Sequence, residues 1–176
     1  MYTARCTRKV LQALHLPAVA QERPPSTALG DWYVNFIHTR SHRLVHFVSD
    51  RSLLSVVVPV KTLKTALDRH IDSLRELLDD MGVAPAIVQA EMAEMGERAV
   101  APTTSRSVLA SMRDLALNAR CALEQVPRIS CLELSRELSQ IPCGPLGMAF
   151  PSELAIVLLL KRHSGPDQTL LNHTGT

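Results

Sequence analysis

Aromatic residues are scarce in this chain, which has one Trp, two Tyr and three Phe among its 176 residues. The core must therefore be built mainly from Leu, Val, Ala and Met. Long hydrophobic runs are also lacking. The longest runs, Leu53–Val60 and Leu154–Leu160, are far shorter than the roughly 20 residues that a membrane-spanning helix needs. The sequence therefore predicts no membrane partner.

Signatures of several enzyme and metal-binding classes are absent as well. The four cysteines form no C-x-x-C pair, which argues against a zinc ribbon and against a thioredoxin-like redox site. The motifs G-x-S-x-G, G-x-x-x-x-G-K-S/T and H-E-x-x-H do not occur. His38, His42 and His46 are spaced like metal ligands, but on a hairpin His38 and His46 would lie on opposite faces. We therefore expect no metal and no cofactor.

The composition is that of an ordinary globular protein, with 46% hydrophobic and 20% charged residues. The formal net charge of +2 is mildly basic and falls short of the strong basicity of dedicated nucleic-acid-binding domains. The amino terminus lacks the apolar segment of a secretory signal, so we expect a cytoplasmic protein with reduced thiols. We predict a single α+β domain over residues 1–163 and a flexible tail over residues 164–176.

Two kinds of periodicity divide the chain into strands and helices. The predicted strands are residues 2–6, 31–39, 42–49 and 53–60, with 99–103 as a further candidate. The predicted helices are one that begins after Thr7, followed by residues 61–81, 86–95, 105–124, 131–138 and 151–161. The expected fold class is therefore α+β. It consists of an N-terminal antiparallel meander of three to five strands, over about residues 2–60, with one face packed against four to six helices.

A tight turn centred on Arg40 and Ser41 sets the register of the predicted hairpin. Residues whose numbers add up to 81 then lie opposite each other. Trp32 falls on the more apolar face, whereas the other face is mixed and places Asn35 opposite His46. A histidine held by an amide can act as an acid or a base near neutral pH. The more common alternative is a half-exposed sheet face whose polar groups are simply hydrogen-bonded.

The predicted helix at residues 105–124 begins with an unusual mixture of side chains. Ser105 can cap its amino terminus. Arg106, Arg113 and Arg120 recur every seven residues and therefore share one face. Next to them lies a polar stripe formed by Ser107, Ser111, Asp114 and Asn118. A helix amino terminus with hydroxyls and an arginine is suited to binding an anion. The alternative is a well-capped helix whose arginines are solvated or paired with nearby acids.

Four short motifs identify the chain with a known sequence pattern. They are Cys6-Thr7-Arg8-Lys9, Trp32-Tyr33-Val34-Asn35, the helix start Ser105–Asp114, and the turn Pro142-Cys143-Gly144. With these motifs the chain resembles, over roughly residues 2–150, an uncharacterised prokaryotic family of domains of unknown function. The family pattern at the helix start reads Asn-Arg-Ser-Val-Leu-Gly-Ser-Met-Asn-Asp. The resemblance implies no established activity.

The chain departs from that family pattern at three places. Ser105 stands where the pattern has asparagine, Ala110 where it has glycine, and Arg113 where it has a second asparagine. Either these exchanges remove chemistry carried by the amides, or they preserve a helix cap and its packing. The resemblance and the hairpin together give the candidate ligand-binding residues Arg106, Ser107, Ser111, Asp114, Trp32, Asn35 and His46.

Three functions are compatible with these features. The leading hypothesis is a small binding module for an anionic ligand, either a nucleic-acid backbone or a phosphorylated metabolite. The second is a metal-independent nuclease or other hydrolase, which requires His46, Arg106 and Asp114 to converge in one pocket. The third is an interaction module that forms a homodimer through the apolar helix at residues 151–161. The sequence favours binding over catalysis.

Overall fold

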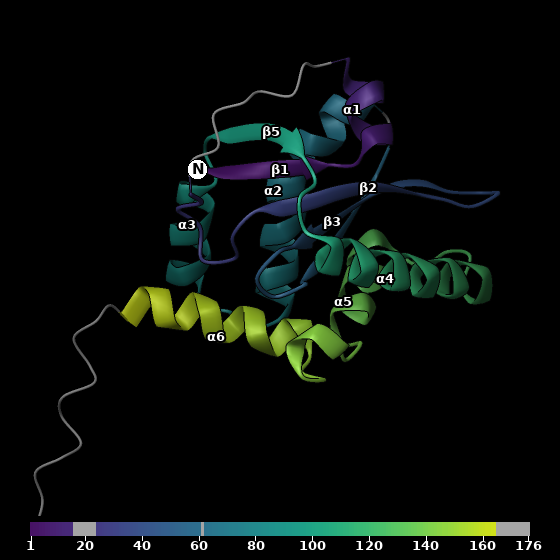
Figure 1. Cartoon of the computed structure of the whole chain (residues 1–176). Coiled ribbons are helices and arrows are strands. Elements are labelled where there is room, and N and C mark those ends of the chain that lie inside the picture. The colour runs from purple at the N-terminus through teal and green to yellow at the C-terminus, as the bar shows by residue number, and fades with distance from the viewer. Residues whose placement is uncertain (16–23, 61, 165–176) are drawn as a thin grey trace, which may run out of the picture.

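The computed structural model describes residues 1–15, 24–60 and 62–164. Over these ranges the chain forms a five-stranded sheet with helices packed on both faces (Figure 1). The strands are β1 (Tyr2–Cys6), β2 (Trp32–His38), β3 (Arg43–Ser49), β4 (Ser55–Pro59) and β5 (Arg98–Pro102). The helices are α1 (Arg8–Leu14), α2 (Leu63–Asp80), α3 (Pro85–Glu94), α4 (Arg106–Gln125), α5 (Cys131–Ser139) and α6 (Pro151–Ser164), with a 3-10 turn at Gly144–Leu146.

Two expectations from the sequence concern the tail and membrane-spanning helices. The predicted tail at residues 164–176 lies outside the described residues, apart from Ser164 at the end of α6. Among the described helices, none combines the length and the apolar character needed to cross a bilayer.

The α+β class is confirmed, and the sheet is mixed. Its strand order is β4-β3-β2-β1-β5. Strands β2, β3 and β4 form the predicted antiparallel meander. Strand β1 pairs in parallel with β2, and β5 pairs in parallel with β1. Parallel neighbours need a crossover connection, and α1 lies in the connection between β1 and β2.

The hairpin register is the one that the turn predicts. Asn35 lies opposite His46, and Trp32 lies opposite Ser49. The amide of Thr39 donates a hydrogen bond of 3.0 Å to the carbonyl of His42, which closes the turn around Arg40 and Ser41. The turn thereby fixes which side chains of β2 face each helical layer.

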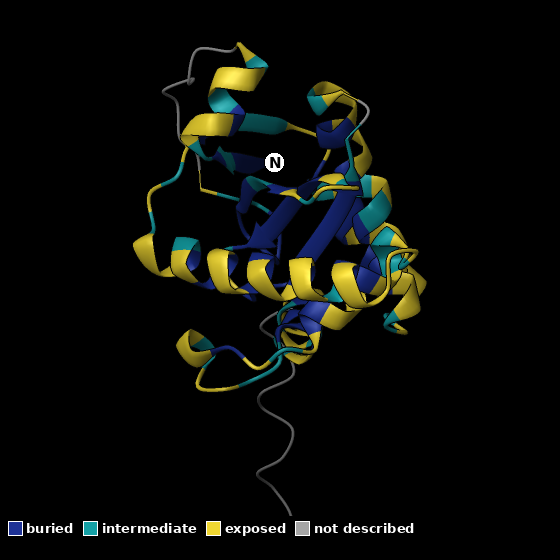
Figure 2. Cartoon of the chain, turned by 90° about the vertical axis from the view of Figure 1, so that its right-hand side faces the viewer, coloured by how far each residue is buried: buried dark blue, intermediate teal, exposed yellow. Residues whose placement is uncertain are grey.

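Both faces of the sheet are buried, whereas the sequence predicted that helices cover only one. Trp32, Val34, Val45 and Phe47 face a core completed by α1, α2, α3 and α6. The opposite face packs against α4 and α5 through Tyr33, Ile37, Leu44 and Val48. Figure 2 shows the strands as buried behind helices whose outer surfaces are exposed. Helices cover the second face because most of the side chains that β2 and β3 direct to it are apolar. Asn35 and His46 are its polar exceptions.

The outer edge of β4 is closed by hydroxyl groups of α5. The amide of Val57 donates to Oγ of Ser135 over 2.8 Å, and the amide of Ser55 donates to Oγ of Ser139 over 3.4 Å. An open strand edge exposes unpaired amides that invite pairing with another chain. The two serines therefore satisfy this edge within the fold and hold α5 against the sheet.

Candidate functional site

Three chain segments meet where the parallel strands end. Cys6, the last residue of β1, pairs with Val34 of β2 and with Pro102 of β5. The next residues along the chain, Thr7 and Asn35, therefore lie beside each other. The hydroxyl of Thr7 donates a hydrogen bond of 3.0 Å to Oδ1 of Asn35. In sheets with parallel strands, the carboxyl ends of those strands are the usual location of ligand sites.

A cavity of about 360 Å³ lies at this edge. We call it the motif pocket, because three of the sequence motifs contribute to it. Its lining residues are Thr7, Arg8, Lys9, Asn35, Thr103, Leu109, Met112 and Arg113. The first motif thus supplies the residues after β1, the second supplies Asn35 from β2, and the third supplies one face of α4.

The motif pocket is strongly cationic. Arg8, Lys9 and Arg113 are exposed, and none of them forms an ion pair with any residue that the structure describes. Among the residues that the structure describes, no acidic residue lines the cavity. Asn35 is half-buried, and its Nδ2 finds no hydrogen-bond acceptor among the described residues. The pocket therefore presents three positive charges and an amide donor that an anion can use.

Tyr33 holds α4 in the position that completes the pocket. Its phenolic oxygen accepts a hydrogen bond of 2.8 Å from the amide of Ser105 and lies 3.2 Å from Oγ1 of Thr104. Ser105 in turn caps α4, because its Oγ accepts a hydrogen bond from the amide of Val108. Since Tyr33 and Asn35 share a face of β2, one strand both anchors the helix and contributes to the cavity.

A sequence model of the domain of unknown function DUF6933 matches residues 3–154. The chain belongs to the DUF6933 family. The matched region contains every residue that lines the motif pocket. No curated protein and no solved structure matches the chain. The family carries no activity that could be transferred, so the function must be argued from the site.

The motif at the start of α4 reaches the pocket through its later residues and not through its first ones. Arg106 and Ser107 are exposed at the start of the helix, Ser111 is buried and Asp114 is exposed. None of these four lines the motif pocket. The face that does so is formed by Leu109, Met112 and Arg113. Arg113 thus brings a positive charge to the cavity.

Trp32 and His46 lie in the interior of the protein. Both side chains have 0% exposure. Trp32 meets the ring of His70 edge to face, with 4.5 Å between ring centroids. Nε2 of His46 lies 3.0 Å from Oγ of Ser55, and burial lowers the pKa of His46 to about 3. No hydrogen bond joins His46 to Asn35, so this strand pair does not form the acid–base arrangement considered from the sequence.

The residues of the hydrolase hypothesis do not converge. His46 is fully buried, whereas Arg106 and Asp114 are exposed on α4. In the described part of the chain, no group of three or more His, Cys, Asp or Glu residues is placed to hold a metal ion. His46, Arg106 and Asp114 therefore do not form one active site.

Helix α6, which the sequence suggested as a homodimer interface, packs part of its apolar surface into the core of its own chain. Ala155 and Leu159 of α6 are buried in the core that α2 and α3 share. Val157 and Leu160 are exposed by 42% and 47%. Isolated exposed apolar residues of this kind are common on monomeric proteins.

Arg8, Lys9 and Thr103 were not among the site residues predicted from the sequence. The signal that would have found them is the parallel pairing of β1 and β5, since the residues that follow parallel strands gather at one edge of the sheet. Thr7 directly precedes α1, as predicted, but its hydroxyl makes no capping hydrogen bond.

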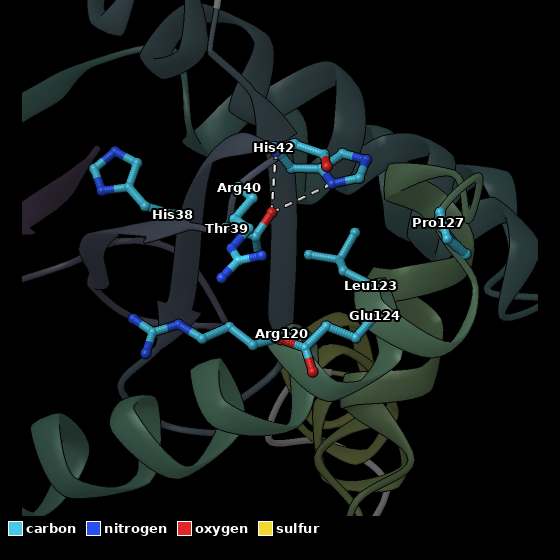
Figure 3. Close-up of a pocket in the computed structure, with 9 residues that line it drawn as sticks. His38, Thr39, Arg40, His42, Arg120, Leu123, Glu124 and Pro127 are labelled. Carbon is cyan, nitrogen blue, oxygen red and sulfur yellow. Dashed lines mark hydrogen bonds between the residues drawn. The ribbon is translucent and has the colours of Figure 1, made fainter.

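A second and larger cavity lies further along the same side of the sheet. We call it the hairpin pocket; its volume is about 750 Å³. Residues of the β2–β3 turn form one wall, and the last turns of α4 form the other (Figure 3). The lining residues are His38, Thr39, Arg40, Ser41, His42, Arg120, Leu123, Glu124 and Pro127.

Proposed function

We propose that the protein binds a phosphate-bearing ligand in the motif pocket. The observation that carries the proposal is the grouping of Arg8, Lys9 and Arg113 around one cavity, without an acidic partner among the described residues. Cations of neighbouring elements repel each other, so their grouping costs free energy unless an anion joins them. A phosphate group satisfies this arrangement best, since it carries more charge than a carboxylate.

The donors of the pocket suit the shape of a phosphate. A guanidinium group such as that of Arg113 can bind two phosphate oxygens at once, and the ammonium of Lys9 adds a point charge. Nδ2 of Asn35 adds a neutral donor whose orientation is set by Thr7. The volume of about 360 Å³ lies within the range of small-molecule sites and is compatible with a mononucleotide. Because the cations are exposed, the affinity should fall as the salt concentration rises.

We further propose that the protein acts in the cytoplasm. All four cysteines, Cys6, Cys121, Cys131 and Cys143, are free thiols. Free thiols are the usual state of cysteine in a reducing compartment, which supports this location.

The experiment uses the full chain with inorganic phosphate and adenosine monophosphate as probes. Binding is followed by amide chemical shifts at low ionic strength, where exposed charges are least screened. Arg113→Gln should weaken binding of both probes about 5- to 10-fold, because it removes one charge-assisted contact. Arg106→Gln is the matched control: it makes the same change on the same helix, seven residues earlier and outside the cavity.

Two results would contradict the proposal. The first is that neither probe shifts the amides of residues 7–9, 35 and 113. The second is that Arg106→Gln weakens binding as much as Arg113→Gln, which would reduce the effect to net charge. Recovery of the shifts after removal of salt, with Arg113→Gln still impaired, supports a site at the cavity.

A further inference from the structure

The wall of the motif pocket has a charged part and an apolar part. Arg8 and Lys9, in the first turn of α1, and Arg113 of α4 supply the charge. Leu109 and Met112, also of α4, supply the apolar surface. A phosphate group uses the cations and gains nothing from two hydrocarbon side chains. The apolar part of the wall therefore bears on what else the ligand carries.

The apolar wall is held in place by the core behind it. Met112 is 1% exposed and belongs to the core that α4 and α5 form with the sheet. Leu109 is half-buried and packs against the same core, so part of its side chain faces the cavity. An apolar group that covers this exposed part of Leu109 removes hydrocarbon surface from water, which is favourable.

The cavity is also much larger than a phosphate group. Its volume of about 360 Å³ lies within the range of sites that hold small organic molecules. A phosphate alone would leave most of this space, including the wall at Leu109, in contact with water. The volume therefore has room for a second portion of the ligand beside the phosphate.

The neutral polar groups of the pocket are few, which restricts the chemistry of that second portion. The hydroxyl proton of Thr7 is already donated to Oδ1 of Asn35. Nδ2 of Asn35 and the hydroxyl of Thr103 remain, and neither has a hydrogen-bond partner in the described part of the chain. A group with many hydroxyls would lose hydrogen bonds to water against Leu109 and Met112 without regaining them. An apolar group has no such loss.

We infer that the ligand of the motif pocket is a phosphomonoester of a compact apolar group, such as a phenyl ring or the face of a nucleobase, which lies against Leu109 and Met112. The inference rests on the proposed function, since the cations of the pocket place the phosphate. Salt screens the charged contacts and leaves the apolar contact unchanged. The affinity that the apolar group adds should therefore persist at salt concentrations that weaken the phosphate contact.

The test compares methyl phosphate, ribose 5-phosphate, phenyl phosphate and adenosine monophosphate at about pH 8, where each carries about two negative charges. Their dissociation constants with the full chain come from titrations of the amide chemical shifts. Phenyl phosphate should bind at least about tenfold more tightly than methyl phosphate, because it covers the apolar wall. Ribose 5-phosphate should gain less than about threefold, because its hydroxyls must be desolvated.

A pair of leucine variants locates the contact. Leu109→Ala removes apolar surface from the wall and keeps every cation. It should lower the affinity ratio of phenyl phosphate to methyl phosphate about fivefold, with methyl phosphate itself bound within about twofold of the wild type. Leu117→Ala is the matched control, since Leu117 lies on the same helix, is 60% exposed and does not line the cavity. The comparison of the esters in the wild type does not depend on how well Leu109→Ala folds.

The outcomes separate this inference from the proposed function. If methyl phosphate shifts the amides of residues 7–9 and 113 but phenyl phosphate binds no more tightly, the apolar group is wrong and the phosphate site stands. The inference is also wrong if ribose 5-phosphate gains as much as phenyl phosphate, or if Leu117→Ala lowers the ratio as much as Leu109→Ala. If no ester binds, both proposals fall.

Adenosine monophosphate distinguishes the sources of the apolar group. An affinity above that of phenyl phosphate, lowered by Leu109→Ala, supports the inference and assigns the group to a nucleotide. An affinity no higher than that of ribose 5-phosphate, while phenyl phosphate keeps its gain, supports the inference and assigns the group to a smaller aryl or alkyl phosphate.

Discussion

The hydroxyl of Thr7 donates a hydrogen bond to Oδ1 of Asn35 over 3.0 Å and joins the end of β1 to the middle of β2. Thr7 also precedes α1, yet its hydroxyl does not cap that helix. The hydroxyl thus orients the Asn35 amide, whose Nδ2 then has a defined direction at the edge of the motif pocket. This side-chain contact adds to the β1–β2 pairing that already joins the two motifs.

Loss of the Thr7 hydroxyl should weaken ligand binding without unfolding the protein. Thr7→Val keeps the side-chain shape and removes the donor, so Asn35 loses its orientation. A neutral hydrogen bond contributes about 1 kcal/mol, which corresponds to a decrease in phosphate affinity of about fivefold. Thr7→Ser keeps the hydroxyl and should bind like the wild type. Titration of the three proteins with adenosine monophosphate checks this, and equal affinities of Thr7→Val and Thr7→Ser would contradict it.

The local elements could be predicted from the sequence because their signals are short-range. Arg40 and Ser41 alone set the pairing of β2 with β3, since a two-residue turn leaves one register. The parallel placement of β1 and β5 could not be predicted in this way. The parallel pairing depends on the position to which the chain returns after its connecting helices. The residues of the strands themselves, 2–6 and 98–102, carry no pattern that specifies this position.

The site was only partly predictable for the same reason. Asn35, a candidate from the sequence, lines the same cavity as Leu109, Met112 and Arg113 of α4, which were not candidates. The cations beside Asn35 come from Arg8 and Lys9, which reach it only through the parallel pairing of β1 and β2. The polar residue His46 made one sheet face look half-exposed, although Ser55 satisfies its Nε2 inside the core. Whether a polar residue is buried or lines the site therefore depends on partners from other strands, which the pattern of a single strand does not show.

Among the glycines that the structure describes, Gly30 should tolerate substitution least. Its φ is +78°, and an added Cβ would lie 2.1 Å from Oδ1 of Asp50, which accepts the amide of Asp31. Gly82 has a φ of +75° but open space around it. Gly82→Ala should cost about 1 kcal/mol for its backbone alone, whereas Gly30→Ala should cost at least about 3 kcal/mol because of the added collision. Urea unfolding of both variants checks this, and equal costs would show that the Asp50 contact gives way.

Ser135 should contribute more to stability than its place on a helix suggests. Its Oγ accepts from the amide of Val57 and donates to the carbonyl of Cys131 over 2.7 Å. Ser135→Ala leaves the buried amide of an edge strand without a partner, at a cost of about 1–3 kcal/mol. Exposed Ser107 on α4 is the control, because alanine there should be neutral or slightly stabilising. Chemical unfolding compares them; a destabilisation of Ser135→Ala no larger than that of Ser107→Ala would mean that water replaces the hydroxyl.

The buried His70 should make the protein sensitive to mild acid. Its ring lies parallel to Phe47, with 4.1 Å between ring centroids and 8° between planes, and its Nδ1 is 3.4 Å from the hydroxyl of Tyr2. Burial, aided by the positive charge of Arg98, lowers the pKa of His70 to about 3. In the unfolded chain the pKa is about 6.5.

The sign of the pH effect follows from these two values. Above about pH 6.5 neither state takes up a proton, and the full stability is present. As the pH falls from there toward about 3, the unfolded chain is protonated and the native His70 is not, so stability is lost. At pH 5 the loss is about 2 kcal/mol for one such histidine.

His70→Phe keeps a ring in the stack and cannot titrate. Its unfolding free energy should therefore fall by about 2 kcal/mol less than that of the wild type between pH 7.5 and pH 5. His46, with the same lowered pKa, is left in place and should still give the variant an acid-sensitive slope. Asp50, whose pKa is raised to about 6 mainly by burial, acts in the opposite direction in both proteins and cancels from the difference. Urea unfolding at the two pH values measures this difference, and parallel losses in wild type and variant would show that His70 is protonated within the fold.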